Sequence, residues 1–350
     1  MTPLAHDEFR TGTGYLAACT MGLLPARASR ALAADLDRAA SGQASMGDYD
    51  EVVRRGRSAF ARLVHVDAGR VAIGSQVSAQ ASVIAAAAPD GAEVLCPIGD
   101  FSSIGAPFAQ QAHRGVRVRE VPLESLADTI TDDTWLVAFS LVQSASGRVA
   151  DVDAVLDAAA RHGARTLADL TQSAGWLDFD ASRADATLCH TYKWLCAPRG
   201  AALMTLSEGF QAELRPVQAG WYAGEEWRTS CYGAEIDLAR DARRFDVSPA
   251  WQAWVGAAES LELFAALDLA AVRAHDVSLA NELCAALGLP AAESAIVTWA
   301  DPDGRDVKAM TDAGLTASGR AGNARVAFHL WNDERDVARI ADAVRVRALA

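Results

Sequence analysis

The sequence predicts an α/β protein with a mostly parallel sheet between layers of helices, and three observations support this prediction. Short apolar runs alternate with helical patterns from about residue 70 to about residue 206. Most of these runs are bounded by Gly, Pro or Asp, which is typical of strands buried on both faces. A chain of 350 residues is also long enough for one large core and a smaller attached domain.

The expected elements follow one another in a regular order. Two helices come first, at Pro25–Arg38 and Tyr49–His65. The expected strands of the main sheet are Val71–Gly74, Glu93–Pro97, Val116–Val121, Trp135–Phe139, Arg165–Leu170, Ala184–Cys189 and Ala201–Leu206. The helices expected between them include Ser78–Ala88, Ser102–His113 and Val152–His162. This alternation of strand and helix predicts parallel pairing.

The last third of the chain has a different pattern. Residues 215–246 show few periodic signals but contain several Trp and Tyr residues, which is typical of a functional segment or an interface. The elements expected after it are helices at Trp251–Leu267, Val277–Leu287 and Asp333–Leu349, and strand-like pieces at Ala295–Trp299 and Ala324–Leu330. We therefore expect a large domain over residues 41–246 and a small α+β domain over residues 247–350, to which residues 1–40 contribute.

The composition excludes several classes of partner. With 45 acidic and 32 basic residues the formal net charge is −13, which disfavours nucleic acid and anionic membranes because both are polyanions. No run approaches the roughly 18 apolar residues of a membrane span, and the N-terminus lacks the apolar stretch of a signal peptide. The six cysteines are scattered, without the spacing of a disulfide framework or a zinc site. We expect free thiols in a cytoplasmic protein.

The stretch from residue 167 to residue 200 carries the chemistry. One predicted strand ends at about Asp169, the next ends near Cys189, and Lys193 follows in a loop. In a parallel sheet, side chains at the carboxyl ends of strands lie where such folds bind ligands. A lysine amine forms an imine with an aldehyde, and a carboxylate pairs with a protonated pyridine nitrogen, so the two residues suit pyridoxal 5'-phosphate (PLP). The alternative is an exposed lysine and a capping aspartate between ordinary strands.

Two motifs in this stretch resemble the signature of the class V aminotransferase superfamily. They are D-L-x-Q-S-A-G at residues 169–175 and Y-K-W-L-x-x-P-x-G at residues 192–200, which place Lys193 twenty-four residues after Asp169. The superfamily includes cysteine desulfurases, kynureninases, isopenicillin N epimerase-like proteins and the C–S lyase of ergothioneine biosynthesis. The chain is most similar to the branch of kynureninase, isopenicillin N epimerase and the ergothioneine C–S lyase.

The resemblance implies a fold and a cofactor. The fold is fold type I of the PLP-dependent transferases, with a mostly parallel seven-stranded sheet in the PLP-binding large domain and a smaller C-terminal α+β domain. Lys193 would form the Schiff base with PLP, and Asp169 would pair with the pyridine nitrogen. Gln172 would donate a hydrogen bond to the phenolic oxygen of the cofactor.

The resemblance also implies a phosphate site. Residues 72–83 follow a strand and open a helix, and backbone N–H groups at a helix N-terminus bind phosphate. Ser75, Gln76 and Val77 correspond to the small-residue phosphate turn of the family, although a plain helix N-cap is the alternative. Tyr192, with His190 or Thr191 beside it, would donate to the same phosphate.

Two aromatic residues are candidates for cofactor contacts. Phe101 is at the position where the family places a ring that stacks on the pyridine. On sequence grounds alone a phenylalanine there is more often a core residue, and the resemblance brings the stacking role level with that alternative. Gly220-Trp221-Tyr222 resembles an element that many members extend towards the cofactor of the partner subunit. The Trp221 N–H would reach the phosphate there, and the alternative is a plain interface aromatic. We therefore expect a homodimer with a shared active site.

The segment from Asn323 to Asn332 resembles the R-x-S-x-x-x-Y-N segment of the superfamily, although Ala327 and Trp331 depart from its serine and tyrosine. The arginine of that segment binds the substrate α-carboxylate through a bidentate fork. Arg325 is our candidate for this role, and Arg320 is the reserve candidate.

The departures from the family pattern bear on the reaction. Residues 315–322 contain no cysteine, so a persulfide-forming desulfurase is disfavoured, and Gln172 stands where kynureninase has histidine. We expect a lyase-type reaction on an L-amino acid or amino-acid conjugate, through an external aldimine and a quinonoid, by β-elimination or by C–S or Cβ–Cγ cleavage. An aminotransferase or epimerase is the alternative, followed by a non-catalytic relative with the same fold. The substrate stays open.

Overall fold

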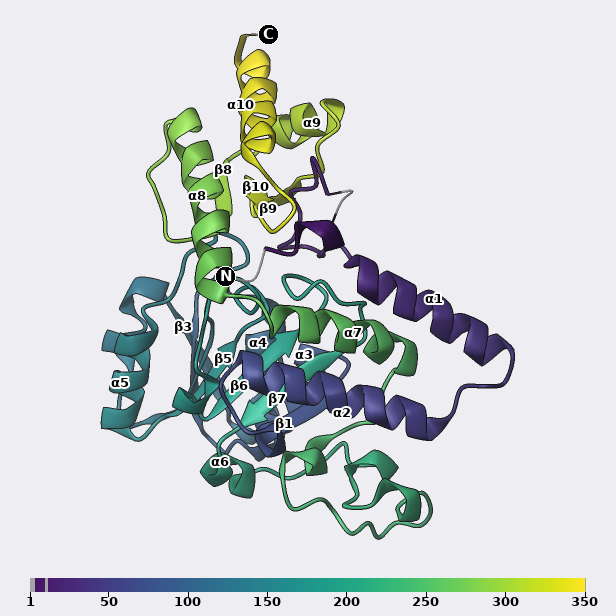
Figure 1. Ribbon diagram of the computed structural model, residues 1–350. Coiled ribbons are helices and arrows are strands. Elements are labelled where there is room, and N and C mark those ends of the chain that lie inside the picture. The colour runs from purple at the N-terminus through teal and green to yellow at the C-terminus, as the bar shows by residue number, and fades with distance from the viewer. Residues whose placement is uncertain (1–3, 10–11, 350) are drawn as a thin grey trace.

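In the computed structural model, residues 4–9 and 12–349 are described, and a seven-stranded sheet forms the centre of the molecule (Figure 1). The strands are β1 (Val71–Gly74), β2 (Glu93–Pro97), β3 (Arg117–Val121), β4 (Thr134–Ser140), β5 (Arg165–Asp169), β6 (Ala186–His190) and β7 (Ala202–Leu206). They are arranged in the order β1-β7-β6-β5-β4-β2-β3. All neighbours are parallel except those of β7, which runs antiparallel to β1 and β6. The predicted mostly parallel seven-stranded sheet is confirmed.

Helices cover both faces of this sheet. The α-helices of the described residues, including those that lie elsewhere in the molecule, are α1 (Ala26–Ala40), α2 (Met46–Leu63), α3 (Val77–Ala87), α4 (Ser102–Ala109), α5 (Val152–His162), α6 (Glu208–Glu213), α7 (Trp251–Phe264), α8 (Leu269–Leu287), α9 (Arg305–Asp312) and α10 (Glu334–Leu349). Alternate side chains of a strand point to opposite faces, so Val137 and Phe139 of β4 enter one hydrophobic cluster and Leu136 and Ala138 enter another. The first cluster includes residues of α2, α5 and α7, and the second includes residues of α3, α4 and α6.

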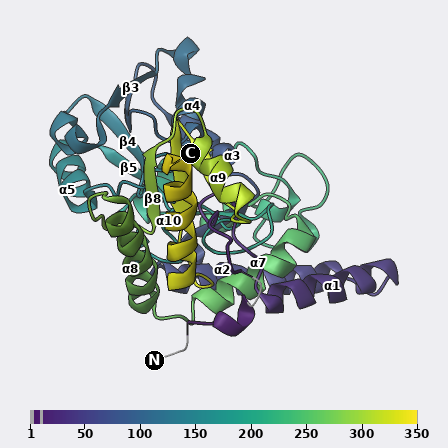
Figure 2. The ribbon, with the colours of Figure 1, turned by 90° about the horizontal axis from the view of Figure 1, so that it is seen from above.

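A second, smaller sheet lies above the first and beside α8 and α10 (Figures 1 and 2). Its strands are β8 (Ile296–Ala300), β9 (Ser318–Arg320) and β10 (Asn323–Ala327), antiparallel in the order β8-β10-β9. The N-terminal segment joins this sheet through parallel bridges from Tyr15 to Thr316 and from Ala17 to Ala327. These bridges favour our assignment of the N-terminal segment to the C-terminal part of the chain, and the domain bounds stay a prediction.

Some element bounds differ from the sequence-based expectation, and two of the differences have a local reason in a capping side chain. α8 begins at Leu269, eight residues before the expected Val277, because the Asp268 side chain accepts the first free N–H groups of the helix. The helix expected to continue to His113 ends at Ala109 and is followed only by a 3-10 turn. α9 was not predicted. It begins directly after a turn, and the Asp301 carboxylate accepts N–H groups at its start.

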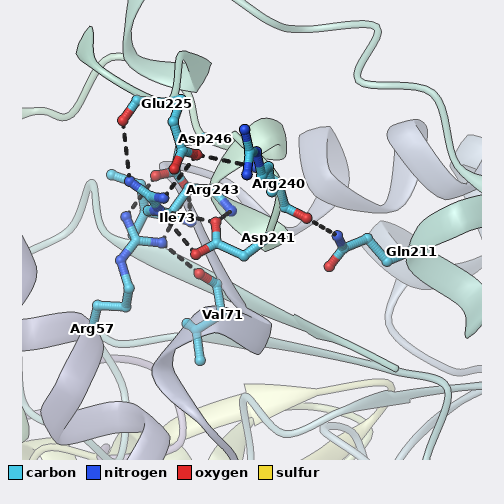
Figure 3. Close-up of polar contacts among 9 residues, drawn as sticks. All are labelled: Arg57, Val71, Ile73, Gln211, Glu225, Arg240, Asp241, Arg243 and Asp246. Carbon is cyan, nitrogen blue, oxygen red and sulfur yellow. Dashed lines mark hydrogen bonds and ion pairs between the residues drawn. The ribbon is translucent and has the colours of Figure 1, made fainter. Parts of the chain in front are cut away.

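A buried arginine–aspartate pair joins α2 to the first strand (Figure 3). Arg57 of α2 donates to both carboxylate oxygens of Asp246, at 2.5 and 3.2 Å, and to the carbonyl of Val71. Asp246 also accepts the N–H of Ile73 at 2.8 Å. Burial by itself lowers the pKa of Arg57, but the facing Asp246 carboxylate more than offsets this, so the pKa is raised. The charge of Arg57 is therefore balanced within the chain.

The six cysteines all lie in the described part of the chain and are free, five of them buried and Cys231 exposed. Nor does any helix in that part combine the length and the apolar character that crossing a membrane requires.

Candidate active site

Lys193 and Asp169 lie at the carboxyl ends of adjacent strands. Asp169 is the last residue of β5. β6 pairs with β5 in parallel and ends at His190, three residues before Lys193. Both side chains are buried, with 4% of Asp169 and 5% of Lys193 exposed. A carboxylate and an amine are thus enclosed at one edge of the sheet.

The pKa values of these two groups are set mainly by their burial. Burial lowers the pKa of the Lys193 amine, and the negative charge of Asp169 works against this shift. Burial raises the pKa of the Asp169 carboxyl to about 6, although the Thr171 N–H donates to its Oδ1 at 2.9 Å. No ion pair joins Lys193 to any residue in the described ranges, so its amine is not engaged by a fixed carboxylate.

Phe101 faces the lysine. Its ring centroid lies 5.0 Å from Lys193 Nζ, and 44% of the side chain is exposed, so it is not a core residue. The neighbouring Asp100 accepts the N–H groups of Phe101 and Ser140 at 2.6 and 2.7 Å, and Gln143 Nε2 donates to it at 3.1 Å. These bonds tie the loop after β2 to the end of β4 and hold the Phe101 ring in front of the lysine.

His190 presents a buried donor next to the start of α3. The N–H of Val77, the first residue of α3, donates to His190 Nε2 at 3.2 Å. The Nε2 atom therefore accepts, and the neutral ring carries its hydrogen on Nδ1. Burial lowers the pKa of His190 to about 4, so the neutral form prevails near pH 7. Nδ1 is buried without a hydrogen-bond partner, which marks a donor that a phosphate oxygen would satisfy.

Of the other expected phosphate ligands, Val77 and Tyr192 contact this histidine directly. Ser75 and Gln76 are half-buried and precede α3, whereas the Val77 N–H is already donated to His190. The Tyr192 ring lies edge-on to His190, with centroids 4.9 Å apart. The guanidinium of the exposed Arg199 lies 4.8 Å from the centre of the Tyr192 ring and adds positive charge here.

The Gln172 side chain is fixed by three hydrogen bonds. Trp194 Nε1 can only donate, so Gln172 Oε1 accepts from it, at 2.8 Å. The Gln172 Nε2 atom then donates to the carbonyl of Cys19 and to Ser144 Oγ, each at 2.9 Å. Both amide hydrogens are therefore engaged within the protein, and a contact of Gln172 with the phenolic oxygen stays a prediction.

Arg325 of β10 is a buried charge surrounded by neutral acceptors. It is 1% exposed, and its guanidinium donates to Ser318 Oγ at 3.2 Å, to Thr20 Oγ1 at 2.9 Å and to both Oγ and the carbonyl of Ser144. In the described part of the chain no carboxylate pairs with it. Burial lowers its pKa, and the positive charge of Arg320 acts in the same direction. A buried guanidinium without a counter-charge is suited to bind an anion.

The N-terminal segment crosses the lysine loop at close range. The Gly22 N–H donates to the Tyr192 carbonyl at 2.9 Å, and a Cβ at Gly22 would lie 2.0 Å from the Lys193 carbonyl oxygen. Only glycine therefore fits at this crossing. The nearby thiol of Cys19 is buried, which raises its pKa against the influence of Arg325 and Lys193. The segment around Gly22 thus packs directly on the backbone of the lysine loop.

Trp221 lies apart from these residues. It begins a 3-10 turn after α6, is half-buried and packs edge-to-face against Tyr222 and Trp227, with centroids 5.1 and 5.5 Å apart. In Figure 1 the segment that follows α6 lies below α2, on the side away from the second sheet. None of its contacts within the described ranges involves Lys193, Asp169 or His190.

Known proteins resemble this chain over most of its length. The model of the class-V aminotransferase family matches residues 38–302. The chain is 26% identical over 360 residues to the uncharacterized aminotransferase YcbU of Bacillus subtilis, a match that covers 95% of this chain and 94% of that protein. It is 24% identical over 335 residues to isopenicillin N epimerase of Streptomyces clavuligerus, with 82% of each chain covered. The chain belongs to the class-V aminotransferase family.

The fold agrees with this membership. The structure of the cystine C–S lyase C-DES, in complex with its reaction product cysteine persulfide, superposes with a TM-score of 0.85 at 21% identity. The match covers 95% of this chain and 98% of that chain. The expected fold type I is confirmed. As a member of this family the chain is a PLP-dependent enzyme, which argues against a non-catalytic relative.

The residues present fit this cofactor. Lys193 offers an amine with no ion-pair partner among the described residues, and Asp169 offers a buried carboxylate for the pyridine nitrogen. The unpartnered Nδ1 of His190 offers a donor for the phosphate, and Phe101 offers a ring face.

The structure also brings residues to the site that the sequence did not single out. Ser144 and Thr20 hold Arg325, Asp100 holds the Phe101 loop, and Trp194 fixes Gln172. Among them only Trp194 lies in a recognisable motif, so the sequence offered a signal for that residue alone.

Proposed function

We propose that this PLP-dependent enzyme is a lyase that removes the α-proton of an L-amino acid or amino-acid conjugate and then cleaves a bond at its β-carbon. The observation that carries the proposal is the buried Lys193 amine, with the Asp169 carboxylate on the adjacent strand end and the unbalanced Arg325 guanidinium nearby. When bound, PLP supplies an electron-withdrawing ring that stabilises negative charge at the substrate α-carbon.

Lys193 has two tasks in this proposal. Its Nζ holds the cofactor at rest and, once released, accepts the α-proton. Burial lowers its pKa, so a larger fraction of the amine is neutral and able to accept a proton near pH 7.

The cofactor-binding residues divide by the part of the cofactor they contact. Asp169 would pair with the ring nitrogen, Phe101 would stack on the ring and Gln172 would contact the phenolic oxygen. The start of α3 and the end of β6 would hold the phosphate, with the candidate residues Ser75, Gln76, Val77, His190 and Tyr192.

Arg325 binds the substrate α-carboxylate. Four of its hydrogen bonds go to Ser318, Thr20 and Ser144, whereas a bidentate carboxylate needs two N–H groups on one side. We expect the carboxylate to replace at least one hydroxyl acceptor. The exposed Arg320, whose Nη1 donates to the neighbouring Gly319 carbonyl, is the reserve candidate.

Two observations support the lyase assignment: the absence of a cysteine from residues 315–322, and the similarity in fold to a C–S lyase. Residues 315–322 contain no cysteine that would receive a sulfur atom, so the persulfide route of a desulfurase is not supported. C-DES, which shares the fold, is a C–S lyase. Aminotransfer and epimerisation begin with the same proton removal and are the other outcomes of the test.

A panel of amino acids and amino-acid S-conjugates tests the reaction. Formation of pyruvate and ammonia in equal amounts would support β-elimination. A matching keto acid with the pyridoxamine form of the cofactor would instead show transamination, and inversion at the α-carbon would show epimerisation. Either of these, without bond cleavage at the β-carbon, would overturn the lyase assignment.

Lys193→Ala is the matched control for the cofactor. The purified wild-type protein should show a visible absorption band from lysine-bound PLP, and the variant should lose both the band and the reaction. A wild-type protein that gains no band from added PLP, or a variant that keeps it, would contradict the role of Lys193.

We further propose a homodimer in which Trp221 reaches the phosphate in the site of the partner subunit, since Trp221 has no described contact with its own site. Trp221→Ala should bind PLP more weakly. Mixing Trp221→Ala and Lys193→Ala subunits should then restore activity, because each hybrid dimer contains one intact site. No recovery in a mixture shown to exchange subunits would count against the shared site.

A further inference from the structure

A buried histidine–aspartate pair lies behind the lysine loop. His329 and Asp276 are both fully buried, and His329 Nδ1 lies 3.0 Å from Asp276 Oδ2. On the other side of the ring, His329 Nε2 lies 2.9 Å from the carbonyl oxygen of Trp194, the residue after Lys193. Since His329 follows β10 and Asp276 belongs to α8, the pair connects two C-terminal elements to the lysine loop.

The hydrogens of this pair follow from the chemistry of its neighbours. A carbonyl oxygen only accepts, so His329 Nε2 must carry a hydrogen. One further proton is shared between Nδ1 and the Asp276 carboxylate, and either location of that proton keeps the hydrogen bond. The ring is also packed against Phe264, with centroids 5.6 Å apart, and against Trp194 and Trp331 at 5.1 and 5.0 Å. Its orientation is therefore fixed.

Hydrogen bonds continue from Trp194 to the proposed substrate clamp. Trp194 Nε1 donates to Gln172 Oε1 at 2.8 Å, and Gln172 Nε2 donates to Ser144 Oγ at 2.9 Å. Arg325 Nη1 donates to the same Ser144 Oγ at 3.1 Å. Arg325 precedes His329 by only four residues, so the two residues are connected both through these hydrogen bonds and directly along the chain.

We propose that Asp276 and His329 form a positioning pair that holds the Trp194 carbonyl and thereby sets the place of Lys193 relative to Arg325. The inference rests on the proposed functions of Lys193 and Arg325. The pair binds neither substrate nor cofactor; it acts through Trp194. Proton transfer depends steeply on the distance between donor and acceptor, so a small shift of Lys193 reduces the rate while the cofactor stays bound.

His329→Phe tests the proposal because it keeps an aromatic ring and removes both hydrogen bonds. We expect kcat to fall about 10- to 100-fold, with KM and PLP content within about threefold of the wild type, as for other supporting residues behind a site. Without any substrate, the pH midpoint of the visible band of lysine-bound PLP should shift by about half a unit or more, because that midpoint reports the surroundings of Lys193 Nζ. The other titratable groups near the pair, His275 and Cys196, are unchanged in this variant.

Two variants of Asp276 form the matched comparison. In Asp276→Asn the amide donates to Nδ1 of a neutral ring, so both hydrogen bonds persist and the band midpoint and kcat should stay near the wild type. Asp276→Leu removes the Nδ1 partner and should shift both. These variants carry the test if His329→Phe does not fold.

A purely structural role would lower the melting temperature of His329→Phe and Asp276→Leu while leaving the band midpoint and kcat unchanged, and that result would overturn the proposal. The same holds if Asp276→Asn behaves like Asp276→Leu. The midpoint needs no substrate, so it stays decisive even if the lyase assignment fails. Persistence of the band in Lys193→Ala would instead refute the proposed function itself.

Discussion

Arg57 and Arg325 are both buried guanidinium groups, but their surroundings differ. Arg57 faces the Asp246 carboxylate and a backbone carbonyl, and its pKa is raised despite burial. Arg325 meets three hydroxyl groups and one carbonyl but no described carboxylate, and burial lowers its pKa. The charge of Arg57 is balanced by a carboxylate within the fold, whereas the charge of Arg325 faces only neutral acceptors among the described residues. This difference supports our proposal that Arg57 has a structural role and that Arg325 binds the substrate.

The largest effect should come from breaking the balanced pair. Arg57→Met leaves the Asp246 carboxylate buried without a positively charged partner, with only the Ile73 N–H donating to it, and should lower the free energy of unfolding by about 3–5 kcal/mol in denaturant titrations. The activity of the folded fraction should not change. The double variant Arg57→Met/Asp246→Leu should recover most of this loss, since apolar replacements of a whole buried pair are often neutral. If the single variant lost less than about 1 kcal/mol of unfolding free energy, the pair would not be important for stability and the contrast between Arg57 and Arg325 would be wrong.

Arg325→Met should show the reverse profile. It removes a charge that no carboxylate in the described chain balances, so the free energy of unfolding should stay within about 1 kcal/mol of the wild type or rise. The value of kcat/KM should fall about 100- to 1000-fold, because the substrate carboxylate loses a buried charged partner. Arg320→Met is the control, and an exposed arginine should cost less than about fivefold. If Arg320→Met gave the larger loss, the reserve candidate would be the clamp.

A smaller effect is expected at Asp169, another site charge that the fold does not balance. Burial raises its folded-state pKa from 3.8 to about 6, so the cofactor-free protein is favoured while this carboxyl is protonated. The contribution of this carboxyl to the free energy of unfolding is therefore fully present below pH 3.8, and it is lost as the pH rises through about 6. Asp169→Asn should therefore stabilise the cofactor-free protein by about 2–3 kcal/mol at pH 8 and hardly at all near pH 4.

Unfolding of the two cofactor-free proteins in parallel at both pH values checks this prediction. The titration of His190 is common to both proteins and cancels in the difference. An equal effect of Asp169→Asn at pH 4 and pH 8 would show that the carboxyl does not carry the expected cost.

The sequence predicted best what is encoded locally. The bounds of β1 and β2 were predicted as observed, because a glycine ends the first strand and a proline the second. Lys193 and Asp169 were placed at neighbouring strand ends because the alternation of strands and helices indicated parallel pairing. Such signals need only the residues within one element and its flanks.

The contacts that complete the site join distant parts of the chain. Arg325 binds Ser144 across 181 residues and Thr20 across 305 residues, and hydroxyl acceptors in irregular segments leave no periodic pattern. The antiparallel direction of β7 likewise depends on how the chain turns after the lysine loop. These features become visible only in three dimensions.

The crossing at Gly22 has a consequence for biosynthesis. The N-terminal segment that contacts the lysine loop is held in turn by hydrogen bonds from the Leu16 N–H to the Thr316 carbonyl and from the Ala327 N–H to the Leu16 carbonyl. At about 5–20 residues per second, roughly ten seconds separate the synthesis of Lys193 from that of these C-terminal residues. Until Thr316 and Ala327 have been made, the segment around Leu16 lacks these two hydrogen bonds. A nascent chain therefore contains Lys193 before the segment that crosses its loop is held in place from both sides.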